Sequence, residues 1–542
     1  MADTAKHLRH IDRMSEQIEL LNDVGIALSN ERDPVRLMER ILLGAKSLTN
    51  ADGGTIYSLA EGADALHFEI MRTDSLGIAL GGPNKPRIDF PPVKLHRENG
   101  EPNKRAVVAY AVLENRTVNI ADAYDAPGFD FSGTRAFDEK TGYRSRSMLT
   151  VPMRNHEDEI TGVLQLLNAR NDRGEIIAFS ETMQRLIESV ASQAAIASTR
   201  TKLMKDMEAL FESFVRLIAD AIDAKSPYTG GHCRRVPIIT MMLADAACDT
   251  IAGELCDFEL DDLQRYELNI AALLHDCGKI TTPEWVMDKA TKLQTVYDRI
   301  REVAARYAVL KAEARVAAER RIAAGENRET VESELKRTCN EMDDELDFLR
   351  RANVGGEFMS DDHKARVVKI AERRWRDVDG YEQPLLSEEE VENLCIARGT
   401  LNDDERQVIQ NHIVATIDML ESLPYPKHLR RVPEYAGAHH ERVDGAGYPR
   451  GLVREQMSWP ARMMAIADVF EALTASDRPY KKAMPLSRAL TILGHMKEEG
   501  HIDPDLFDVF IRQEVWKRYA EEHLSAEQRD EVDMSKIPGF TV

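Results

Sequence analysis

The 542-residue sequence is poor in features that mark several protein classes. Its six cysteines are scattered without a C-x-x-C pair. This spacing argues against a disulfide scaffold or a zinc finger and favours a reducing compartment. No apolar run reaches membrane-spanning length, and the N-terminus lacks a signal-peptide pattern. We therefore expect a cytoplasmic protein without membrane insertion.

Positive charge is also in short supply, because 71 Lys and Arg residues face 93 Asp and Glu residues, for a net charge of −22. Binding to a nucleic-acid polymer through its backbone needs a basic surface, so this class of protein is excluded. A phosphorylated ligand must be held by a local cluster of cations or by metal ions. The 43% apolar content is that of a globular protein, and the length predicts about three units.

Residues 16–198 are predicted to form a mixed α/β unit. Helices are predicted from Ile18 to Leu28 and again after Asp33-Pro34. Short strand-like runs then alternate with turns rich in Gly, Asn and Asp. These runs are residues 54–57, 66–70, 147–151 and 162–166.

A long helix is predicted to leave this unit near Ser180 and to end near Ala224, so that residues 199–224 form a link. Apolar residues on it step by four and three, which is the spacing of a coiled-coil stripe. The stripe is Leu203, Met207, Leu210, Phe214, Leu217 and Ala221. Two interpretations stay open, a dimeric signalling helix that joins a sensor to an output domain and an amphipathic helix that packs on its own domain.

The segment 225–500 is helix-rich and contains two blocks of candidate metal ligands. The first block ends near residue 293, and the second begins near residue 401. Residues 294–400 between them have a different composition. Two apolar stripes on either side of Gly325-Glu326-Asn327 predict an antiparallel helical hairpin. The insertion carries no dense cluster of ligating residues, so we interpret it as an interaction or dimer arm. Residues 501–542 are predicted to be a C-terminal helical tail.

Histidines and carboxylates recur as adjacent pairs in the two blocks. His275-Asp276 follows an apolar helix, and His439-His440 opens the run H-H-E-x-x-D-G-x-G-Y-P-x-G-L at residues 439–452. A pair of metal ions that activates water for attack on a phosphodiester needs imidazole nitrogens, carboxylate oxygens and a ligand that bridges both ions. Neighbouring side chains on a helix diverge by about 100°, so each adjacent pair suits two ions better than one. One such pair alone is a weak signal, but the joint pattern is strong.

These motifs resemble the HD-GYP family, a subgroup of HD-domain hydrolases that opens cyclic dinucleotides. Residues 439–452 agree with the family signature throughout, and residues 466–474 and 477–481 are also similar. The resemblance implies an all-α output domain that holds two divalent ions, with Asp276 as the bridge. The metal ligands that it implies are His232, His275, Asp276, His412, His439, His440 and Asp468.

The same resemblance implies catalytic and substrate contacts. Asp276 and Lys279 are the implied catalytic residues, and Lys279 would stabilise phosphate charge or the attacking hydroxide. The implied substrate-binding residues are Lys279, Gly447, Tyr448, Arg478 and Lys481. A ligand set of N and O atoms without thiolate suits Fe or Mn and is compatible with Zn. Tyr228 stands where relatives with three metals have Glu, so we expect two ions per chain.

The resemblance implies a cyclic di-GMP phosphodiesterase that hydrolyses a 3′–5′ phosphodiester to linear pGpG, with GMP open as a further product. A phosphodiesterase for the mixed cyclic dinucleotide cyclic GMP-AMP is an alternative. So is an HD hydrolase of other phosphorylated nucleotides. A catalytically inactive signalling adaptor, in which the insertion and the 439–452 loop recruit partners, is an alternative of another class. The complete set of ligands argues against the adaptor.

The N-terminal unit resembles a GAF domain of the cyclic-nucleotide phosphodiesterase kind. The likeness is carried by the runs at residues 137–149, 151–153 and 155–168. It implies an antiparallel sheet with flanking helices, and either a pocket for a small ligand, of which a cyclic mononucleotide is one candidate, or a domain that only dimerises. The candidate ligand contacts are Asn119, Asp122, Phe137 and Asp138. Together the features predict a homodimeric two-metal phosphodiesterase that its GAF domain regulates.

Overall fold

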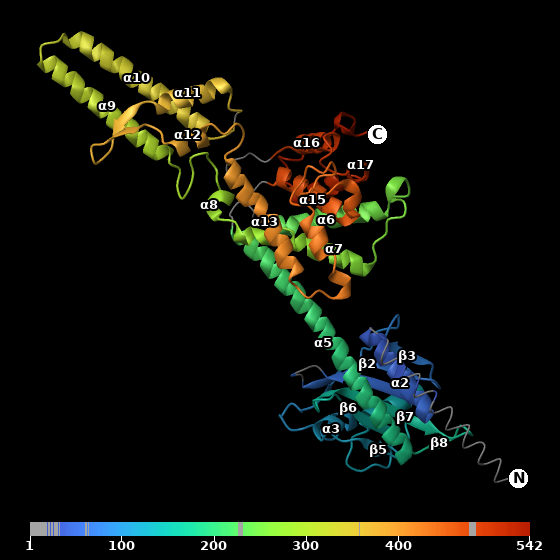
Figure 1. Ribbon diagram of the computed structural model, residues 1–542. Coiled ribbons are helices and arrows are strands. Elements are labelled where there is room, and N and C mark those ends of the chain that lie inside the picture. Colours follow the sequence, from blue (N-terminus) through green and yellow to red (C-terminus); the bar gives the residue numbers. More distant parts are fainter. Residues whose placement is uncertain are drawn as a thin grey trace. The chain divides into compact units, whose positions relative to one another are not determined.

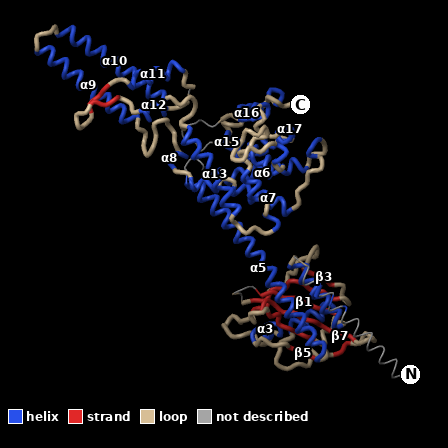
Figure 2. Tube along the Cα trace, viewed as in Figure 1, coloured by secondary structure: helices blue, strands red, loops and turns tan. Residues whose placement is uncertain are grey.

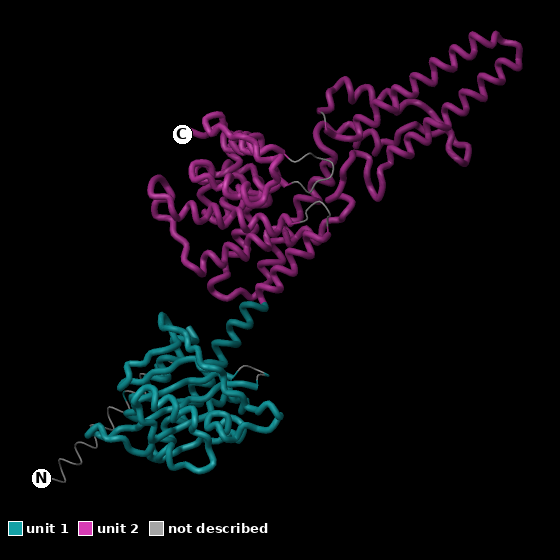
Figure 3. The backbone as a smooth tube through the Cα atoms, turned by 180° about the vertical axis from the view of Figure 1, so that it is seen from behind, with its two compact units in different colours: residues 1–210 teal, residues 211–542 magenta. Residues whose placement is uncertain are grey.

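The computed structural model describes residues 33–59, 62, 64–225, 231–356, 358–475 and 484–541, together with residues 19, 22, 25, 26 and 31. The helix predicted at residues 18–28 lies largely outside the described residues. The chain divides into two compact units, residues 1–210 and residues 211–542 (Figure 3). Among the described helices, none is long and apolar enough to cross a membrane.

The first unit is built on one antiparallel sheet in the order β3-β2-β1-β7-β6-β5, in which β4 pairs with β2 and β8 with β7 (Figure 1). The sheet and its flanking helices confirm the predicted fold of this unit. The strands are β1 (Ala51–Leu59), β2 (Ala65–Thr73), β3 (Ile78–Gly81), β4 (Val93–Lys94), β5 (Val118–Ile120), β6 (Met148–Arg154), β7 (Ile160–Arg170) and β8 (Ile176–Ile177). The helices are α2 (Pro34–Thr49), α3 (Val107–Leu113), α4 (Ser132–Thr141) and α5 (Glu181–Lys225).

Helix α2 and the first part of α5 share one hydrophobic core with the sheet. Asp33 starts α2 because its carboxylate accepts a hydrogen bond from the Val35 N–H at 2.8 Å, and Pro34 occupies the first turn. The apolar face of α2 then meets strand β1 so closely that a Cβ on Gly54 would lie 2.7 Å from Leu42 Cδ1. Ile187 of α5 is fully buried in the same cluster. Helix α3 contacts strands β6 and β7.

The second unit is mostly helical. Its helices outside the insertion are α6 (His232–Cys248), α7 (Asp262–Leu274), α8 (Glu284–Met287), α13 (Asp403–Glu421), α14 (Val432–Gly437), α15 (Trp459–Thr474), α16 (Leu486–Glu498), α17 (Pro504–Arg512) and α18 (Val515–His523). They enclose one large core that also takes in the end of α5 through Val215, Ala219 and Ile222.

The residues after 500 differ from the predicted tail, because they complete this core. The ring of Phe470 on α15 packs at 5.0 Å from Phe510 and at 5.9 Å from Tyr519, measured between ring centroids. Phe510 and Tyr519 are buried, and so is Ile537 near the end of the chain. Burial of a large apolar side chain contributes about 1.5–3 kcal/mol, so these residues stabilise the unit that contains the candidate ligands.

The insertion is larger than a helical hairpin. The predicted hairpin is present as α9 (Ile300–Ala323) and α10 (Arg328–Asn353), which lie side by side (Figure 2). It is followed by α11 (Asp361–Ala371), by the paired strands β9 (Arg374–Arg376) and β10 (Glu382–Pro384), and by α12 (Glu388–Leu394). These elements share a separate core that includes Tyr307, Leu349, Val367 and Leu385. The insertion is therefore a subdomain with its own packing.

Candidate metal centre

Three candidate histidines are oriented by the helices on which they lie. His275 follows the last residue of α7, His412 lies within α13, and His439 follows α14. The Nδ1 atom of each ring bonds the backbone carbonyl oxygen three residues earlier, at 2.7, 2.5 and 2.6 Å respectively. Because a carbonyl only accepts, Nδ1 carries the proton in each ring, and Nε2 is left as a free acceptor. Metal-ligating histidines are commonly fixed in this way.

His232 is oriented by a side chain instead. It opens α6, and its Nδ1 donates to the Glu471 carboxylate on α15. Glu471 is 1% exposed and also accepts a hydrogen bond from Arg235 Nε at 2.6 Å. The sequence analysis missed Glu471. Its position three residues after Asp468, on the same face of a helix, is a signal that could have identified it.

The carboxylate of Asp276 lies between two groups of imidazoles. Its Oδ2 is 3.3 Å from Nε2 of His232 and 3.3 Å from Nε2 of His275, whereas its Oδ1 is 3.3 Å from Nε2 of His412. One possible metal-binding group is His232, His275 and Asp276, and the other is Asp276, His412, His439 and His440. Asp468 joins the first group, because its Oδ1 is 3.2 Å from His232 Nε2. One shared carboxylate between two groups is the arrangement that a pair of ions requires.

Unpartnered atoms at the centre fit divalent cations. Asp276 Oδ1, His412 Nε2 and His439 Nε2 are buried without a hydrogen-bond partner, although buried polar atoms are normally paired. Nε2 of His232 and Nε2 of His275 face each other at 3.2 Å, and each lies 3.3 Å from Asp276 Oδ2. A cation would satisfy all of these lone pairs. The nitrogen and oxygen donors suit Fe, Mn or Zn.

The charges of the centre agree with this fit. Burial by itself would raise the pKa of Asp276, but Lys279 and His275 hold that pKa well below its usual range. Burial lowers the pKa of His440 to about 4 and also lowers the pKa of His439. At neutral pH the carboxylate is therefore ionised and these two rings are neutral, which is the protonation state of metal ligands.

The loop after His440 is held by Glu441, whose carboxylate is 1% exposed. It accepts hydrogen bonds from the backbone N–H groups of Arg450, at 2.7 Å, and Leu452, at 2.9 Å. The ring of Tyr448 stacks on His440 with 4.9 Å between ring centroids. The loop is thus bonded at its far end and stacked on a candidate ligand in its middle.

Gly447 has a structural reason to be glycine. A Cβ at this position would lie 2.3 Å from the Arg442 backbone nitrogen and 2.5 Å from Glu441 Cα. Two backbone segments thus approach so closely here that only glycine fits, and the substrate contact at Gly447 stays a prediction.

The remaining predicted substrate contacts divide into two kinds. Lys279 lies at the centre, where its Nζ is 2.5 Å from Asp276 Oδ2 and its side chain is 23% exposed. Arg478 and Lys481 lie outside the described residues, and so does Tyr228. Of the three predicted substrate-binding cations, Lys279 is thus the one that the structure describes. It lies beside the shared carboxylate, and its partly exposed side chain can also face a substrate.

The GAF-like unit encloses a cavity of about 380 Å³ between the sheet and the segments around α3 and α4. Six aromatic rings and several aliphatic side chains form most of its wall, and polar side chains from the sheet, including Thr55 and Gln165, also line it. A mostly apolar cavity with a few polar groups is the usual form of a small-molecule site. Of the four predicted ligand contacts, Phe137 lines this cavity.

The other three predicted contacts are not among the residues that line the cavity, and their polar atoms are bonded within the domain. The Asn119 amide donates to the Phe179 carbonyl at 3.1 Å. Asp122 pairs with Arg144 and Arg146 at 3.4 Å each. Asp138 is buried and accepts hydrogen bonds from the Ser145 N–H and hydroxyl, at 2.8 and 2.9 Å. Asn119, Asp122 and Asp138 thus have structural contacts within the domain, and their role as ligand contacts stays a prediction.

Comparison with protein families agrees with this division of the chain. A GAF domain model matches residues 33–197, and an HD domain model matches residues 389–506. The chain contains a GAF domain and an HD domain. The predicted resemblance to a GAF domain joined to an HD-type phosphohydrolase domain is confirmed.

Several curated proteins resemble parts of the chain. The 3′3′-cGAMP-specific phosphodiesterase 1 of Vibrio cholerae is 43% identical over 114 residues, which are 21% of this chain and 26% of that protein. The 3′3′-cGAMP-specific phosphodiesterase 3 of the same organism is 27% identical over 302 residues, 55% of this chain and 38% of that protein. A cyclic di-GMP phosphodiesterase of Pseudomonas aeruginosa is 49% identical over 74 residues, 14% of this chain and 17% of that protein. The chain thus spans less than two fifths of each relative.

Proposed function

We propose that this protein is a metal-dependent cyclic-dinucleotide phosphodiesterase that hydrolyses cyclic di-GMP to linear pGpG. The observation that carries the proposal is the buried Asp276 carboxylate, shared by two groups of imidazoles whose free Nε2 atoms converge on it. The named activities of the relatives support the same reaction class. Cyclic GMP-AMP is the second candidate substrate, favoured by the two Vibrio relatives.

The residues of the chain have distinct roles in this reaction. When bound, two divalent ions supply the Lewis acidity that activates water and polarises the scissile phosphodiester. His232, His275 and Asp468 would hold one ion, His412, His439 and His440 the other, and Asp276 both. Lys279 places a fixed positive charge beside Asp276, where it can stabilise charge on the phosphate oxygens. Arg478 and Lys481 are proposed to hold substrate phosphates.

The test is turnover of a panel of cyclic dinucleotides by protein whose metal content has been measured under anaerobic conditions. Wild type should contain two ions per chain and hydrolyse cyclic di-GMP fastest. Asp276→Ala should lose both the ions and the activity, because Asp276 belongs to both groups. Asp245→Ala, at an exposed carboxylate on α6 paired with Arg265, is the matched control and should behave as wild type. Metal content in Asp276→Ala equal to that of wild type would contradict the assignment.

The exposed stripe on α5 supports a homodimer. Leu203, Met207, Leu210, Phe214 and Leu217 are between 56% and 72% exposed, so the described residues leave this face of α5 largely uncovered. An apolar stripe at coiled-coil spacing that is left uncovered favours a second copy of the same helix as its partner. Of the two interpretations of this helix, we propose the dimeric one.

The end of α5 is bonded to both sides of the candidate metal centre. The Asp223 carboxylate accepts hydrogen bonds from the backbone N–H groups of Gly231 and Cys233, at 3.0 and 3.2 Å, which flank His232. Lys225 Nζ donates to the carbonyl oxygens of Lys279, at 3.1 Å, and Thr282, at 2.7 Å. A rotation of α5 would therefore displace a candidate ligand and the catalytic lysine together.

We propose that a small ligand in the GAF cavity regulates hydrolysis through α5. The ligand must bind two states of the protein with different affinity, because otherwise no population shifts. Cyclic mononucleotides are the first ligands to test. One residue inserted after Lys205 would rotate the stripe by about 100° and should uncouple the rate from the ligand, whereas a seven-residue insertion keeps the stripe in phase and should preserve the response. Equal ligand responses in both insertion variants would exclude this coupling.

A further inference from the structure

The insertion contains a second cavity, of about 130 Å³, whose wall is rich in positive charge. Lys292, Arg351, His363 and Arg366 line it, and Phe348 forms part of its apolar wall. Arg366 is paired with the Asp344 carboxylate at 2.5 Å, and its guanidinium lies 4.3 Å from the centre of the Phe348 ring. Within the described part of the chain, Lys292, Arg351 and His363 form no ion pair with a carboxylate. This excess of cations is unusual for a protein with a net charge of −22.

Lys292 is the buried cation of this cavity, with an exposed fraction of 1%. Its ammonium donates hydrogen bonds to two backbone carbonyls, those of Leu394 at 3.0 Å and Ile396 at 2.8 Å. Burial lowers its pKa. A buried charge without a counterion carries a desolvation cost that a bound anion offsets. Carbonyl oxygens satisfy two of the three ammonium donors but do not neutralise the charge.

We propose that this cavity is a regulatory site for a small phosphate-bearing anion. Lysine and arginine are the side chains that hold phosphate oxygens in proteins. The volume accommodates a phosphate group, and Phe348 offers an apolar surface to whatever the phosphate is attached to. The ligand is either free phosphate or the phosphate monoester of a small metabolite, since both present the same anionic group.

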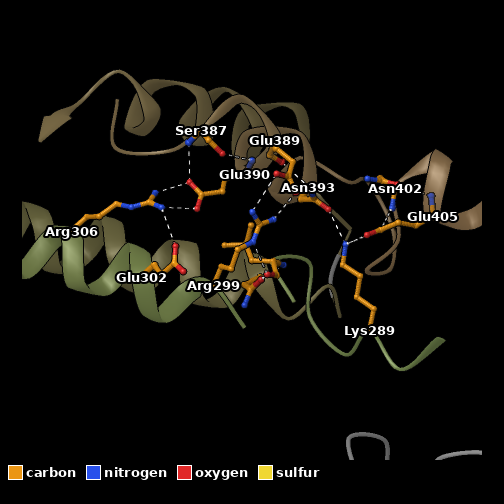
Figure 4. A network of polar contacts seen from close by, with 12 residues as sticks. Lys289, Arg299, Glu302, Arg306, Ser387, Glu389, Glu390, Asn393, Asn402 and Glu405 are labelled. Atoms are coloured by element: carbon orange, nitrogen blue, oxygen red, sulfur yellow. Dashed lines mark hydrogen bonds and ion pairs between the residues drawn. The ribbon is translucent and has the colours of Figure 1, made fainter. Parts of the chain in front are cut away.

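A buried network joins this cavity to the helix of His412, and Figure 4 shows the part of it around Lys289, Asn393 and Glu405. Lys292 bonds the carbonyl of Leu394, the last residue of α12. The preceding residue, Asn393, accepts a hydrogen bond from Lys289 Nζ at 2.9 Å. The same ammonium lies 2.7 Å from each carboxylate oxygen of Glu405, in the first turn of α13. Lys289 thus ties α12 of the insertion to α13.

An anion at Lys292 is expected to act on this network. It would compete with the Leu394 and Ile396 carbonyls for the ammonium and so displace the end of α12. Asn393 and Lys289 would transmit that displacement to Glu405, two helical turns before His412. The predicted effect on hydrolysis rests on the proposed function, whereas the binding of the anion does not.

The binding test uses equilibrium dialysis of the full chain with radiolabelled inorganic phosphate, in metal-loaded and in metal-stripped protein. Wild type should bind one phosphate per chain with the same affinity in the metal-loaded and the metal-stripped protein. Arg351→Glu reverses a charge at an exposed position of the cavity wall and should weaken this binding at least tenfold. Arg337→Glu, at an exposed arginine on the same helix α10, is the matched control and should bind as wild type. Equal affinity in the two variants, or no metal-independent phosphate in wild type, would overturn the proposal.

Two further measurements identify the ligand and the effect. Displacement of the metal-independent phosphate by GMP assigns the site to phosphate monoesters, and displacement by inorganic phosphate alone assigns it to the free anion. Phosphate at a concentration that fills the site of wild type but not that of Arg351→Glu should change the hydrolysis rate of wild type and Arg337→Glu at least threefold and that of Arg351→Glu much less. Equal responses in all three proteins would exclude the regulatory role. If wild type hydrolyses no cyclic dinucleotide, the proposed function fails, but the dialysis result stands on its own.

Discussion

Replacement of Glu471 by glutamine should weaken the binding of one metal ion and leave the binding of the other nearly unchanged. The buried carboxylate of Glu471 accepts from His232 Nδ1 and from Arg235 Nε. A glutamine side chain has almost the same shape, but its amide group offers one acceptor oxygen and one donor nitrogen. In Glu471→Gln one of the two donors must therefore face an N–H group. The ring of His232 then turns away or moves its proton to Nε2, and in both cases it is a poorer ligand.

The expected magnitude follows from the geometry of the two groups. Loss of a hydrogen-bond partner behind a metal ligand costs about 10- to 100-fold in metal affinity, which is about 1.4–2.7 kcal/mol. His232 belongs to the group with His275 and not to the group with His412 and His439. The affinity of one ion should fall by this factor, and that of the other should change by less than about threefold because its own ring contacts remain.

The assay is a titration of metal-stripped protein with Mn²⁺ in competition with a chromophoric chelator, fitted with two sites. Glu267→Gln is the matched control, because Glu267 is a buried carboxylate on α7 whose hydrogen bond among the described residues is from the Arg431 N–H, at 2.7 Å, and not from a candidate ligand. It should leave both affinities at the wild-type value. The reasoning is refuted if Glu471→Gln binds both ions with wild-type affinity, or if it lowers the affinity for both ions equally.

Further substitutions test the other parts of the centre. His439→Ala should lose one ion more readily than the other, as measured by metal content after dialysis, because His439 belongs to the group with His412 and His440 and not to the group with His232 and His275. Gly447→Ala should lower the free energy of unfolding by about 1–3 kcal/mol through overpacking and reduce turnover with metal content unchanged; wild-type turnover would exclude the close approach at Gly447. Lys225→Met should reduce kcat with both ions retained, since Lys279 loses its support, whereas Lys205→Met at an exposed position of the same helix should not.

The local features of the metal centre could be predicted from the sequence because they depend on nearby residues. The apolar helix before His275 and the helix that carries His412 follow from periodicity and from caps such as Asn402, whose side chain accepts from the Glu405 N–H at 2.8 Å. The motif at residues 439–452 identified the histidine pair. What the motif did not show is that Glu441 bonds the far end of this loop.

Features that depend on long-range packing could not be predicted. Phe510 and Tyr519 looked like parts of a tail, because nothing local shows that Phe470 lies beside them. In the GAF domain, the resemblance places Asn119 and Asp138 in the region of ligand contacts, but whether a polar side chain faces a cavity or bonds the backbone depends on the whole fold. The prediction of a hairpin stopped at α10 because the short elements that follow it have weak periodicity.

The two groups of imidazoles are supported by different parts of the chain. Asp276 belongs to both groups, so its surroundings depend on both supports. The first group depends on the end of α5, where Asp223 bonds the backbone beside His232. The second depends on α13, which Lys289 ties to the insertion through Glu405. A pair of ions with a shared carboxylate works only at one spacing of its two groups. Under the proposed function, a displacement of either support would change that spacing, and by this route the GAF domain and the insertion would each control the reaction without touching the substrate.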